Sequence, residues 1–470
     1  MSETLQPGRA LLTDIQRAHI HFVGIGGIGL SAIARIFLAW GARVSGSDLH
    51  LSPITASLSE LGAVVFAGHR AENIAGATLV VISSAVPPDN PEVMAARAKG
   101  VPVVKRADII GEIMAGRYGI AIAGTHGKTT TTAMIAHILH QAGQDPTFIA
   151  GGIVGDLHAN ARAGHGPHFV IEADEYDYMF LGLRPQLAVV THLEHDHPDC
   201  FPTMADMMDA FNRFLALVPA DGHIVGCADE PHVRELLDGY AASGSVTVVR
   251  YGLLPGADWH AAEIAPHDAG GSNATVLCHD KPVGHMRLLV PGRHNIKNAL
   301  AAVASATIAG VEAATACAAL ETFHGVQRRF EIKGERNGIT VVDDYAHHPT
   351  EVRATLAAAR ERYPGRRLWA FFQPHTFSRL EALWADFLTA FDAADHVIVS
   401  DIYAARERAD ERAVRAADLA EQIVHPSVRY CATLREAAQY LREHLQRGDV
   451  LVTLGAGDGS AVGEDVLQNL

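Results

Sequence analysis

Short hydrophobic runs alternate with amphipathic stretches along the chain, and this alternation predicts strands followed by helices. Residues 20–23 form an apolar run that leads into glycines, and the helical pattern of residues 30–40 follows. Two further strand-like runs cover residues 42–45 and 78–83. Strands that alternate with helices favour a parallel, doubly wound α/β sheet.

The alternation begins again at two later points, which indicates three α/β units. The second unit has a helical pattern at 131–142 and strand-like runs at 119–123, 168–172 and 187–191. The third has a helical pattern at 349–362 and strand-like runs at 340–343, 368–372, 396–400 and 450–454. Since a domain typically holds roughly 100–200 residues, the length of 470 residues also fits three domains. We expect them at 1–117, 118–328 and 329–470.

Composition narrows the class of protein. Hydrophobic residues make up 48% of the chain and charged residues 19%, which excludes a largely disordered protein. The formal net charge of -15 argues against general binding to nucleic acids or anionic membranes. The five cysteines form no CxxC pair, and no apolar run reaches the roughly 18–20 residues that span a bilayer. We therefore expect a cytoplasmic protein with no nucleic-acid partner and no membrane insertion.

A glycine-rich turn follows the first predicted strand and precedes a helix. Its glycines are Gly24, Gly26, Gly27 and Gly29. Such glycines permit a tight turn and let backbone amides approach a phosphate at the helix N-terminus. Asp48 lies 19 residues after Gly29, where an acidic group can meet a ribose hydroxyl. The turn predicts a nucleotide-diphosphate site; an NAD-dependent oxidoreductase and a glycine-rich helix entry without ligand are the alternatives.

A second loop, between the strand of 119–123 and the helix of 131–142, carries a sharper signal. Its backbone N–H groups and a lysine ammonium can hold triphosphate oxygens, while a threonine hydroxyl can ligate Mg²⁺. The spacing is GxxGK[ST], shorter than the common GxxxxGK[ST] loop. A turn with a solvated lysine is the alternative. The loop residues are Gly124, Thr125, His126, Gly127, Lys128, Thr129 and Thr130.

Acidic and imidazole groups end two neighbouring strands of the second unit. The segment EADE begins at Glu172, and EHDH covers residues 194–197. Mg²⁺ takes few protein oxygens together with phosphates and water, so these groups could complete a nucleotide–magnesium site. Zinc is the competing interpretation, because His192, His195 and His197 crowd one segment. Surface carboxylates beside an ordinary histidine are the third alternative.

The third unit contributes polar motifs at strand ends and at its junction with the second. DDYAHHPT covers residues 343–350, and Gln373–His375 is followed by Arg379. Either motif could contact a ligand or only cap a helix. Two arginines, Arg328 and Arg329, stand at the inferred domain joint, where a guanidinium can reach a phosphoryl group. An ordinary charged surface linker is the alternative there.

Taken together, these motifs resemble the Mur ligase family. The matching segments are HFVGIGGIG from His21, AGTHGKTTTT from Ala123, EADE from Glu172, PGRHN from Pro291, RRF from Arg328, DDYAHHPTE from Asp343, QPH from Gln373 and LGAGD from Leu454. They run in the family's order across nearly the whole chain. The resemblance implies the α/β three-domain Mur ligase architecture, with Rossmann-like N- and C-terminal domains and a central P-loop ATPase domain.

The resemblance also implies roles in nucleotide and metal binding. Lys128 and Thr129 would hold the β- and γ-phosphates of ATP and Mg²⁺, with Glu172 and His197 as further metal ligands. Asn295 and Asp344 would contact adenine and ribose. These residues and the rest of the phosphate loop form the expected cofactor site.

Substrate contacts follow from the same resemblance. The glycines from Gly24 to Gly29, with Asp48, would hold the UDP portion of a UDP-sugar. His348, His375 and Arg379 would face the substrates. Arg329 would contact phosphate in the transition state. With Lys128, Glu172 and His197, we assign catalytic roles to Arg329 and to His348, the latter as a candidate base.

The implied reaction joins L-alanine to the lactyl carboxylate of UDP-N-acetylmuramate at the expense of ATP, through an acyl phosphate, in peptidoglycan precursor synthesis. A ligase that recycles the tripeptide L-alanyl-γ-D-glutamyl-meso-diaminopimelate is the alternative, because Glu175-Tyr176-Asp177 resembles that enzyme as much. A nucleotide-binding regulator without turnover is a third possibility. His192 and Thr376 depart from residues common in relatives, asparagine and arginine respectively. We expect a monomer or a homodimer.

Overall fold

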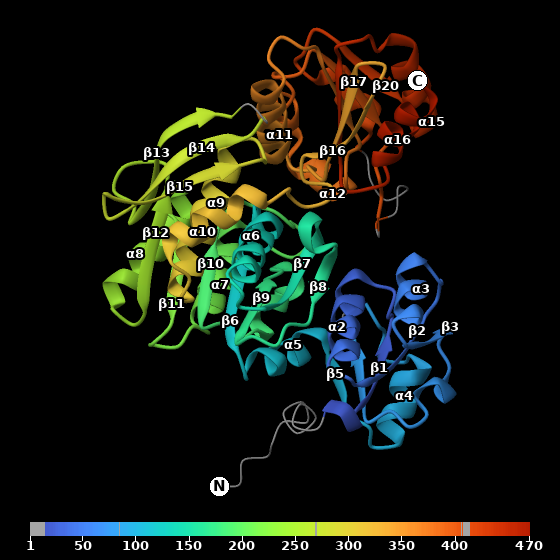
Figure 1. Ribbon diagram of the computed structural model, residues 1–470. Coiled ribbons are helices and arrows are strands. Elements are labelled where there is room, and N and C mark those ends of the chain that lie inside the picture. Colours follow the sequence, from blue (N-terminus) through green and yellow to red (C-terminus); the bar gives the residue numbers. More distant parts are fainter. Residues whose placement is uncertain (1–14, 84, 268–269, 406, 408–413) are drawn as a thin grey trace.

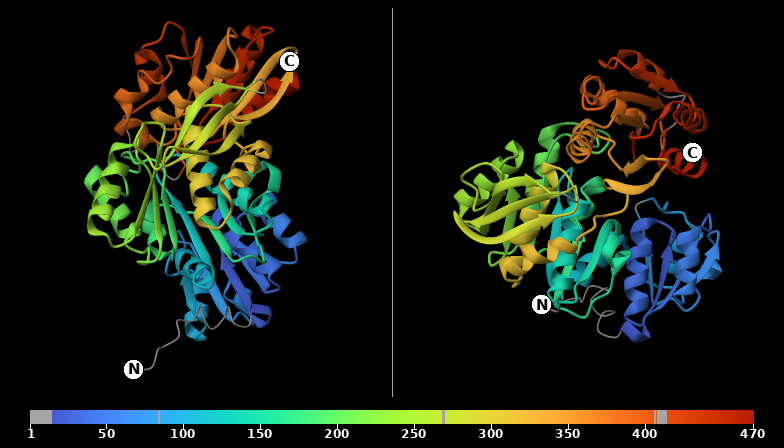
Figure 2. Two further views of the ribbon diagram at one scale, coloured as in Figure 1. Left: turned by 60° about the vertical axis from the view of Figure 1, so that its left-hand side comes forward. Right: turned by 45° about the horizontal axis from the view of Figure 1, so that its top comes forward.

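The computed structural model describes residues 15–470 except 84, 268–269, 406 and 408–413, and it contains three sheets, each with its own covering helices. The N-terminal and C-terminal domains both border the central domain (Figure 1). In the second view of Figure 2 the N-terminal domain (blue) and the C-terminal domain (orange to red) lie on two sides of the central one. This confirms the expected three-domain α/β architecture.

The N-terminal sheet is parallel, with the strand order β3-β2-β1-β4-β5. β1 is buried along its whole length, which is why its sequence is continuously apolar apart from two histidines. The predicted helix at 30–40 begins two residues earlier, at Ile28. The strands are β1 (His19–Val23), β2 (Arg43–Asp48), β3 (Val64–Ala67), β4 (Leu79–Ile82) and β5 (Val103–Lys105); the helices are α2 (Ile28–Ala39), α3 (Pro53–Glu60), α4 (Pro91–Ala98) and α5 (Arg106–Met114).

The central sheet has ten strands in the order β15-β14-β13-β12-β11-β10-β6-β9-β7-β8, parallel at its centre and antiparallel towards both edges. Its strands are β6 (Tyr118–Ala123), β7 (Thr147–Val154), β8 (Ala159–Arg162), β9 (His168–Glu172), β10 (Leu187–Val190), β11 (His223–Cys227), β12 (Thr247–Gly252), β13 (Trp259–Pro266), β14 (Ser272–Cys278) and β15 (Lys281–Leu288). Its helices are α6 (Lys128–Gln141), α7 (Met204–Leu215), α8 (Pro231–Ser243), α9 (Arg293–Ile308) and α10 (Ala313–Ala319).

The C-terminal sheet has the order β16-β17-β21-β18-β19-β20, and only β16 runs antiparallel to its neighbour. Its strands are β16 (Glu331–Arg336), β17 (Ile339–Asp344), β18 (Leu368–Phe372), β19 (His396–Ser400), β20 (Val428–Cys431) and β21 (Val450–Leu454). Its helices are α11 (Pro349–Arg362), α12 (Phe377–Ala382), α13 (Trp384–Phe387), α14 (Ala416–Gln422), α15 (Leu434–His444) and α16 (Ser460–Asn469).

The N-terminal and central domains share apolar packing. One cluster of buried side chains runs from Phe22 and Ile33 to Phe169 and Phe211. The backbones of the two domains also meet closely, since a Cβ on Gly111 would lie 2.2 Å from the Gly182 carbonyl oxygen. Apolar burial of this kind stabilises a fixed arrangement. The N-terminal domain is therefore firmly docked on the central one.

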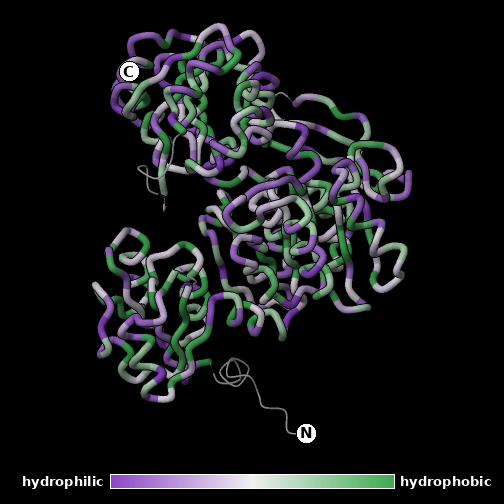
Figure 3. The backbone as a smooth tube through the Cα atoms, turned by 180° about the vertical axis from the view of Figure 1, so that it is seen from behind, coloured by the Kyte–Doolittle hydropathy of each residue, from purple (hydrophilic) through white to green (hydrophobic). Residues whose placement is uncertain are grey.

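The C-terminal domain has its own core. Its two apolar clusters, within the described part of the chain, draw their buried members only from residue 330 onward. The strands at the centre of this domain are mostly hydrophobic (Figure 3). Its contacts with the central domain include the polar pairs His126–Glu351, Arg379–Asp196 and Arg362 with the Gly270 carbonyl. Directional contacts of this type hold an interface that can separate.

The carboxyl ends of the parallel strands position the polar motifs. β6 leads into the phosphate loop and lies between β10 and β9. The loop is therefore flanked on one side by the segment that follows Val190 and on the other side by Glu172. Asp344 ends β17 in the other sheet. Ligands of open α/β sheets bind at these strand ends. Among the described residues, no helix is long and apolar enough to cross a membrane.

Candidate active site

The phosphate loop joins β6 to α6, so that the first backbone N–H groups of α6 are free to face a ligand. Gly127 has φ +82, and a Cβ there would lie 2.5 Å from Oδ1 of Asn298, so the turn requires glycine. Lys128 folds back over the loop, where its Nζ donates to the Gly124 carbonyl and lies 2.9 Å from Oε1 of Glu175. The Lys128 ammonium and the first backbone N–H groups of α6 therefore face the same space beside the loop.

Lys128 and Glu175 form a buried ion pair. Burial opposes the charge of Lys128, but Glu175 and Glu172 outweigh it and raise the lysine pKa. Burial raises the pKa of Glu175 to about 7, with Lys128 opposing this shift. Oε2 of Glu175 is buried without a hydrogen-bond partner among the described residues. A phosphate oxygen can therefore replace Glu175 beside a lysine that stays charged at neutral pH.

Oxygen donors gather beside the loop. Oγ1 of Thr129 donates to Oε1 of Glu172 at 3.1 Å, and Oε2 of Glu172 accepts from the Gly151 N–H at 2.6 Å. Nε2 of His197 lies 3.8 Å from Oε1 of Glu175. These groups are one hydroxyl, two carboxylates and one imidazole, and one oxygen of Glu175 has no hydrogen-bond partner among the described residues. Such a set fits a hard divalent cation that also binds phosphate oxygens.

His192, His195 and His197, on which the zinc interpretation was based, each contact a different group. Nε2 of His195 meets the Phe201 carbonyl at 2.8 Å, whereas Nδ1 of His192 lies 2.9 Å from Glu230. His197 instead faces Glu175. Each imidazole therefore has its own partner in a different direction. This arrangement argues against a zinc site shared by the three.

The two arginines at the domain joint point to different sides. Nε of Arg328 donates to Asp343 at 3.0 Å and its Nη2 donates to the Gly455 carbonyl at 2.7 Å, so Arg328 joins parts of its own domain. Arg329 lies 3.5 Å from Oε1 of Glu351 and lines both cavities beside the phosphate loop. Of the pair, Arg329 is the one placed to meet a phosphoryl group.

A cavity of about 610 Å³ extends from the loop to the junction of the central and C-terminal domains. Asn295 and Asp344 line it, as the resemblance implied, together with the apolar side chains of Leu253 and Val290. Asp344 accepts the backbone N–H groups of Phe330 and Ala346, each at 2.8 Å, and burial raises its pKa to about 6. An apolar wall with polar groups at one end suits a nucleoside.

A second cavity of about 390 Å³ lies on the other side of the loop and is lined by all three domains. Lys128, Glu172 and His197 come from the central domain; His375 and Arg379 come from the C-terminal domain. Nη1 of Arg379 contacts both Nδ1 and the carbonyl oxygen of His375, at 3.1 and 3.0 Å. The predicted phosphate, metal and substrate residues therefore meet at one junction.

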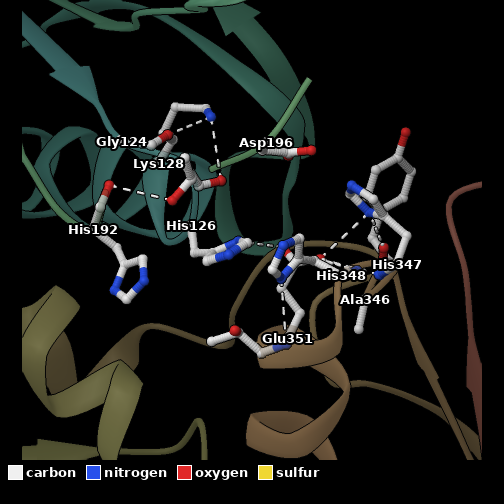
Figure 4. A network of polar contacts seen from close by, with 12 residues as sticks. Gly124, His126, Lys128, His192, Asp196, Ala346, His347, His348 and Glu351 are labelled. Atoms are coloured by element: carbon white, nitrogen blue, oxygen red, sulfur yellow. Dashed lines mark hydrogen bonds and ion pairs between the residues drawn. The ribbon is translucent and has the colours of Figure 1, made fainter. Parts of the chain in front are cut away.

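His347, rather than the predicted His348, lines this cavity. Nδ1 of His347 faces the Tyr345 carbonyl at 2.9 Å, which requires a proton there and makes Nε2 an acceptor. Burial lowers the pKa of His347 to about 3. His348 is buried, and its Nδ1 accepts from the Thr350 N–H at 3.3 Å. Figure 4 shows both histidines at the start of α11, opposite the phosphate loop.

The glycine turn of the N-terminal domain lies at the end of β1. The backbone N–H of Gly26 donates to Oδ2 of Asp48 at 2.9 Å, so this carboxylate organises the turn itself. Of the four glycines, Gly29 lines the three-domain cavity, next to the buried guanidinium of Arg106. Nε of Arg106 is buried without a hydrogen-bond partner in the described residues. A cation therefore lies beside the predicted diphosphate turn.

Sequence reasoning did not assign site roles to the carboxylates Glu175, Glu194, Asp196 and Glu351, nor to Arg106 and His347. Glu175, Glu194 and Asp196 stand inside motifs that follow strands, so that position was a usable signal, whereas Glu351 lies in the first turn of α11. His347 stands inside the motif DDYAHHPT, which did not distinguish it from His348, and Arg106 had no such signal. Their placement depends on how the domains dock.

The fold and the phosphate loop define a three-domain α/β protein with a nucleotide-type cavity at its domain junction. Residues 19–118 match the domain described as Mur ligase family, catalytic domain. Residues 122–306 match the Mur ligase middle domain, and 328–457 match the Mur ligase glutamate ligase domain. The chain belongs to the Mur ligase family, a family of enzymes.

Two curated relatives that match nearly the whole chain carry the same name. The UDP-N-acetylmuramate–L-alanine ligase of Desulfosudis oleivorans is 46% identical over 96% of this chain and 98% of that protein. The ligase of the same name from Caldanaerobacter subterraneus is 42% identical over 96% and 97%.

Solved structures are similar over the same span. The UDP-N-acetylmuramate-alanine ligase of Thermotoga maritima matches with a TM-score of 0.78 and 30% identity, covering 96% of this chain and 98% of that one. A murein peptide ligase from Psychrobacter arcticus matches with a TM-score of 0.71 and 28% identity, over 96% and 99%. The predicted family is thereby confirmed.

Proposed function

We propose that this protein is an ATP-dependent ligase that joins L-alanine to the lactyl carboxylate of UDP-N-acetylmuramate in cytoplasmic peptidoglycan precursor synthesis. One observation carries the proposal: a single cavity is lined by the glycine turn at Gly29, the phosphate-loop Lys128 and the C-terminal Arg379. A UDP-sugar, a triphosphate and an amino acid can therefore meet there. The name shared by relatives that cover the whole chain supports the choice of alanine.

The first step activates a poor acyl donor. A carboxylate oxygen of the UDP-sugar attacks the γ-phosphorus of ATP, ADP leaves and an acyl phosphate forms. Negative charge spreads over the phosphoryl oxygens and the leaving oxygen in this step. Lys128 and the amides at the start of α6 are placed to stabilise that charge. Arg329, on the wall of both cavities, adds a guanidinium from the other side.

The second step forms the amide. The amine of alanine attacks the acyl carbon and phosphate leaves, so the incoming ammonium must first lose a proton. His347 offers Nε2 as an acceptor in the three-domain cavity. We assign it the positioning of the ammonium, since its low pKa makes it a weak base. His348 remains our candidate base, although it lines neither cavity; its Nε2 is buried without a hydrogen-bond partner among the described residues.

Thr129, Glu172 and His197, with Glu175 beside them, would hold Mg²⁺. The ion would supply positive charge to the phosphate oxygens of ATP. Gly151 fixes Glu172 by its N–H, and a Cβ at Gly151 would lie 2.6 Å from Oε2 of Glu172. The close approach orients this carboxylate before any ligand arrives.

The assay measures ADP release with ATP, MgCl₂ and UDP-N-acetylmuramate while alanine, glycine, serine or the tripeptide is offered separately. We expect turnover only when the UDP-sugar and an amine are both present, with the highest kcat/KM for alanine. A preference for the tripeptide would establish the recycling ligase instead. ADP release without an acceptor, or none under any condition, would contradict the proposal.

Gly29→Ala is expected to weaken UDP-sugar binding selectively. The new Cβ would lie 1.9 Å from Nη1 of Arg106, so the guanidinium must leave the diphosphate turn. Loss of one charge-assisted hydrogen bond costs about 1.5–3 kcal/mol, so KM for the UDP-sugar should rise about tenfold or more. KM for ATP should stay within about twofold because the ATP site is separate.

Gly239→Ala is the matched control for this variant. Gly239 also lies in a helix, α8, and a Cβ there would have no neighbour within 4 Å. Its KM values should match those of the unmodified protein. An unchanged KM for the UDP-sugar in Gly29→Ala would show that the turn does not hold the diphosphate.

A further inference from the structure

His126 of the phosphate loop bridges two domains through its ring. Its Nε2 contacts Oε1 of Glu194, which follows β10 in the central domain. Its Nδ1 lies 3.1 Å from Oε1 of Glu351, in the first turn of α11 in the C-terminal domain. The side chain is 13% exposed, so water screens these contacts little. Figure 4 shows His126 directed towards the start of α11.

Both contacts require a proton on the ring nitrogen, so the bridging form is the imidazolium. Burial alone would lower the pKa of His126, but the carboxylates of Glu351 and Glu194 outweigh burial and raise this pKa to about 9. The rings of His192 and His348 lie 5.2 and 4.9 Å from that of His126. Glu351 is also faced by Arg329, by His294 and by His347, whose Nδ1 lies 3.4 Å from Oε2 of Glu351.

The same two carboxylates organise the start of α11. Oε2 of Glu194 accepts from the Thr350 hydroxyl at 3.0 Å, and Oε2 of Glu351 accepts from the His347 backbone N–H at 3.0 Å. Glu351 also contacts Arg329 at 3.5 Å. The bridge therefore connects the phosphate loop to Arg329 and His347, two residues that line the three-domain cavity.

We propose that His126 is a positioning residue that aligns the C-terminal domain on the phosphate loop, acting as a cationic bridge between Glu194 and Glu351. The C-terminal domain has its own core, so polar bridges of this kind decide how closely it approaches. Without the bridge, Arg329 and His347 are no longer held in position relative to Lys128. This inference rests on the proposed ligase function for its kinetic test.

His126→Gln tests the bridge, because glutamine keeps a donor of similar reach but no charge. We expect kcat to fall by about 10²-fold, the cost of a misplacement of about 1 Å. The Kd of a non-hydrolysable ATP analogue with MgCl₂ should stay within about twofold, as for an uncoupled site. His279→Gln, an exposed histidine 3.6 Å from Asp258, is the control and should change neither value.

Scattering gives a readout independent of turnover. The radius of gyration of the unmodified protein should decrease when the ATP analogue and the UDP-sugar are added at pH 7, and that of His126→Gln should decrease less. Because docking raises the pKa of His126 from 6.5 to about 9, its full stabilisation of the docked arrangement is present below pH 6.5 and is lost as the pH rises through about 9. Compaction of the unmodified protein should therefore weaken between those values, and that of His126→Gln should not.

A double-mutant cycle with Glu351→Gln separates the bridge from a direct role on phosphate. If His126 acts through Glu351, the double variant should lose no more kcat than the worse single variant. Additive losses, or a rise in the Kd of the ATP analogue with normal compaction, would overturn the inference. If the unmodified protein lacks ligase turnover, the proposed function fails; if it turns over and His126→Gln keeps its kcat, only the bridge fails.

Discussion

Replacing Lys128 with alanine is expected to lower kcat for ADP release by about 10³-fold, the loss typical of removing one strong electrostatic contact to a transition state. The ammonium is held beside the Gly124 carbonyl at the start of α6, where a phosphate oxygen can take the place of Glu175. Steady-state ADP release with saturating substrates measures the effect. Glu175, with its pKa already at about 7, can take a proton when its partner is removed, so the fold should persist.

Lys281→Ala is the matched control, because Lys281 is an exposed lysine at the start of β15. It should keep its kcat. Circular dichroism and the thermal midpoint should confirm that Lys128→Ala is folded. A kcat within tenfold of the unmodified protein would contradict the role of the loop and, with it, the ATP-dependent mechanism.

Arg379→Ala should produce the second large loss, in kcat/KM. Nε of Arg379 lies 3.1 Å from Oδ1 of Asp196, and both side chains are nearly buried between the central and C-terminal domains. Burial opposes the charge of Asp196, but Arg379 holds its pKa well below the ordinary value. Removing one partner of a buried pair costs about 3–5 kcal/mol, which disfavours the docked arrangement by about 10²–10⁴-fold. Kinetics and the radius of gyration with bound ligands measure both consequences.

The double variant Asp196→Asn/Arg379→Met separates docking from substrate contact. It removes both charges and keeps the volume, so compaction with ligands should largely return. Turnover should stay low, because Arg379 also lines the three-domain cavity and contacts His375. Normal compaction in Arg379→Ala alone would show that the pair does not control docking.

The elements of the three units could be predicted because each depends on local periodicity. The strand at 20–23, the strand at 168–172 and the helix at 349–362 lie where the pattern placed them, within one residue at each end. The strands of 259–288 were not predicted. They pair antiparallel with one another at one end of the central sheet, and their register depends on that pairing rather than on a continuous apolar run.

Some residues of the candidate site could likewise be predicted from local sequence, and others could not. The phosphate loop and Glu172 could be found because a loop between strand and helix, and a carboxylate at a strand end, are local features. Arg329 and Arg328 could not be distinguished, since their opposite directions come from the left-handed backbone at Arg328 (φ +59) and from partners in β17 and beyond. His347 and His348 likewise stand side by side in one motif, and only the structure shows that His347 lines the three-domain cavity while His348 caps α11.

Local sequence patterns were enough to predict the three α/β units, the phosphate loop with Lys128, and the family to which the chain belongs. Hydrogen bonding within helices and the alternation of buried positions act over a few residues, so short segments encode them. The contacts of His126 with Glu351, 225 residues later, and of Arg379 with Asp196 arise from domain packing. These contacts require the central and C-terminal sheets to place their strand ends around one cavity, and no local pattern records that placement.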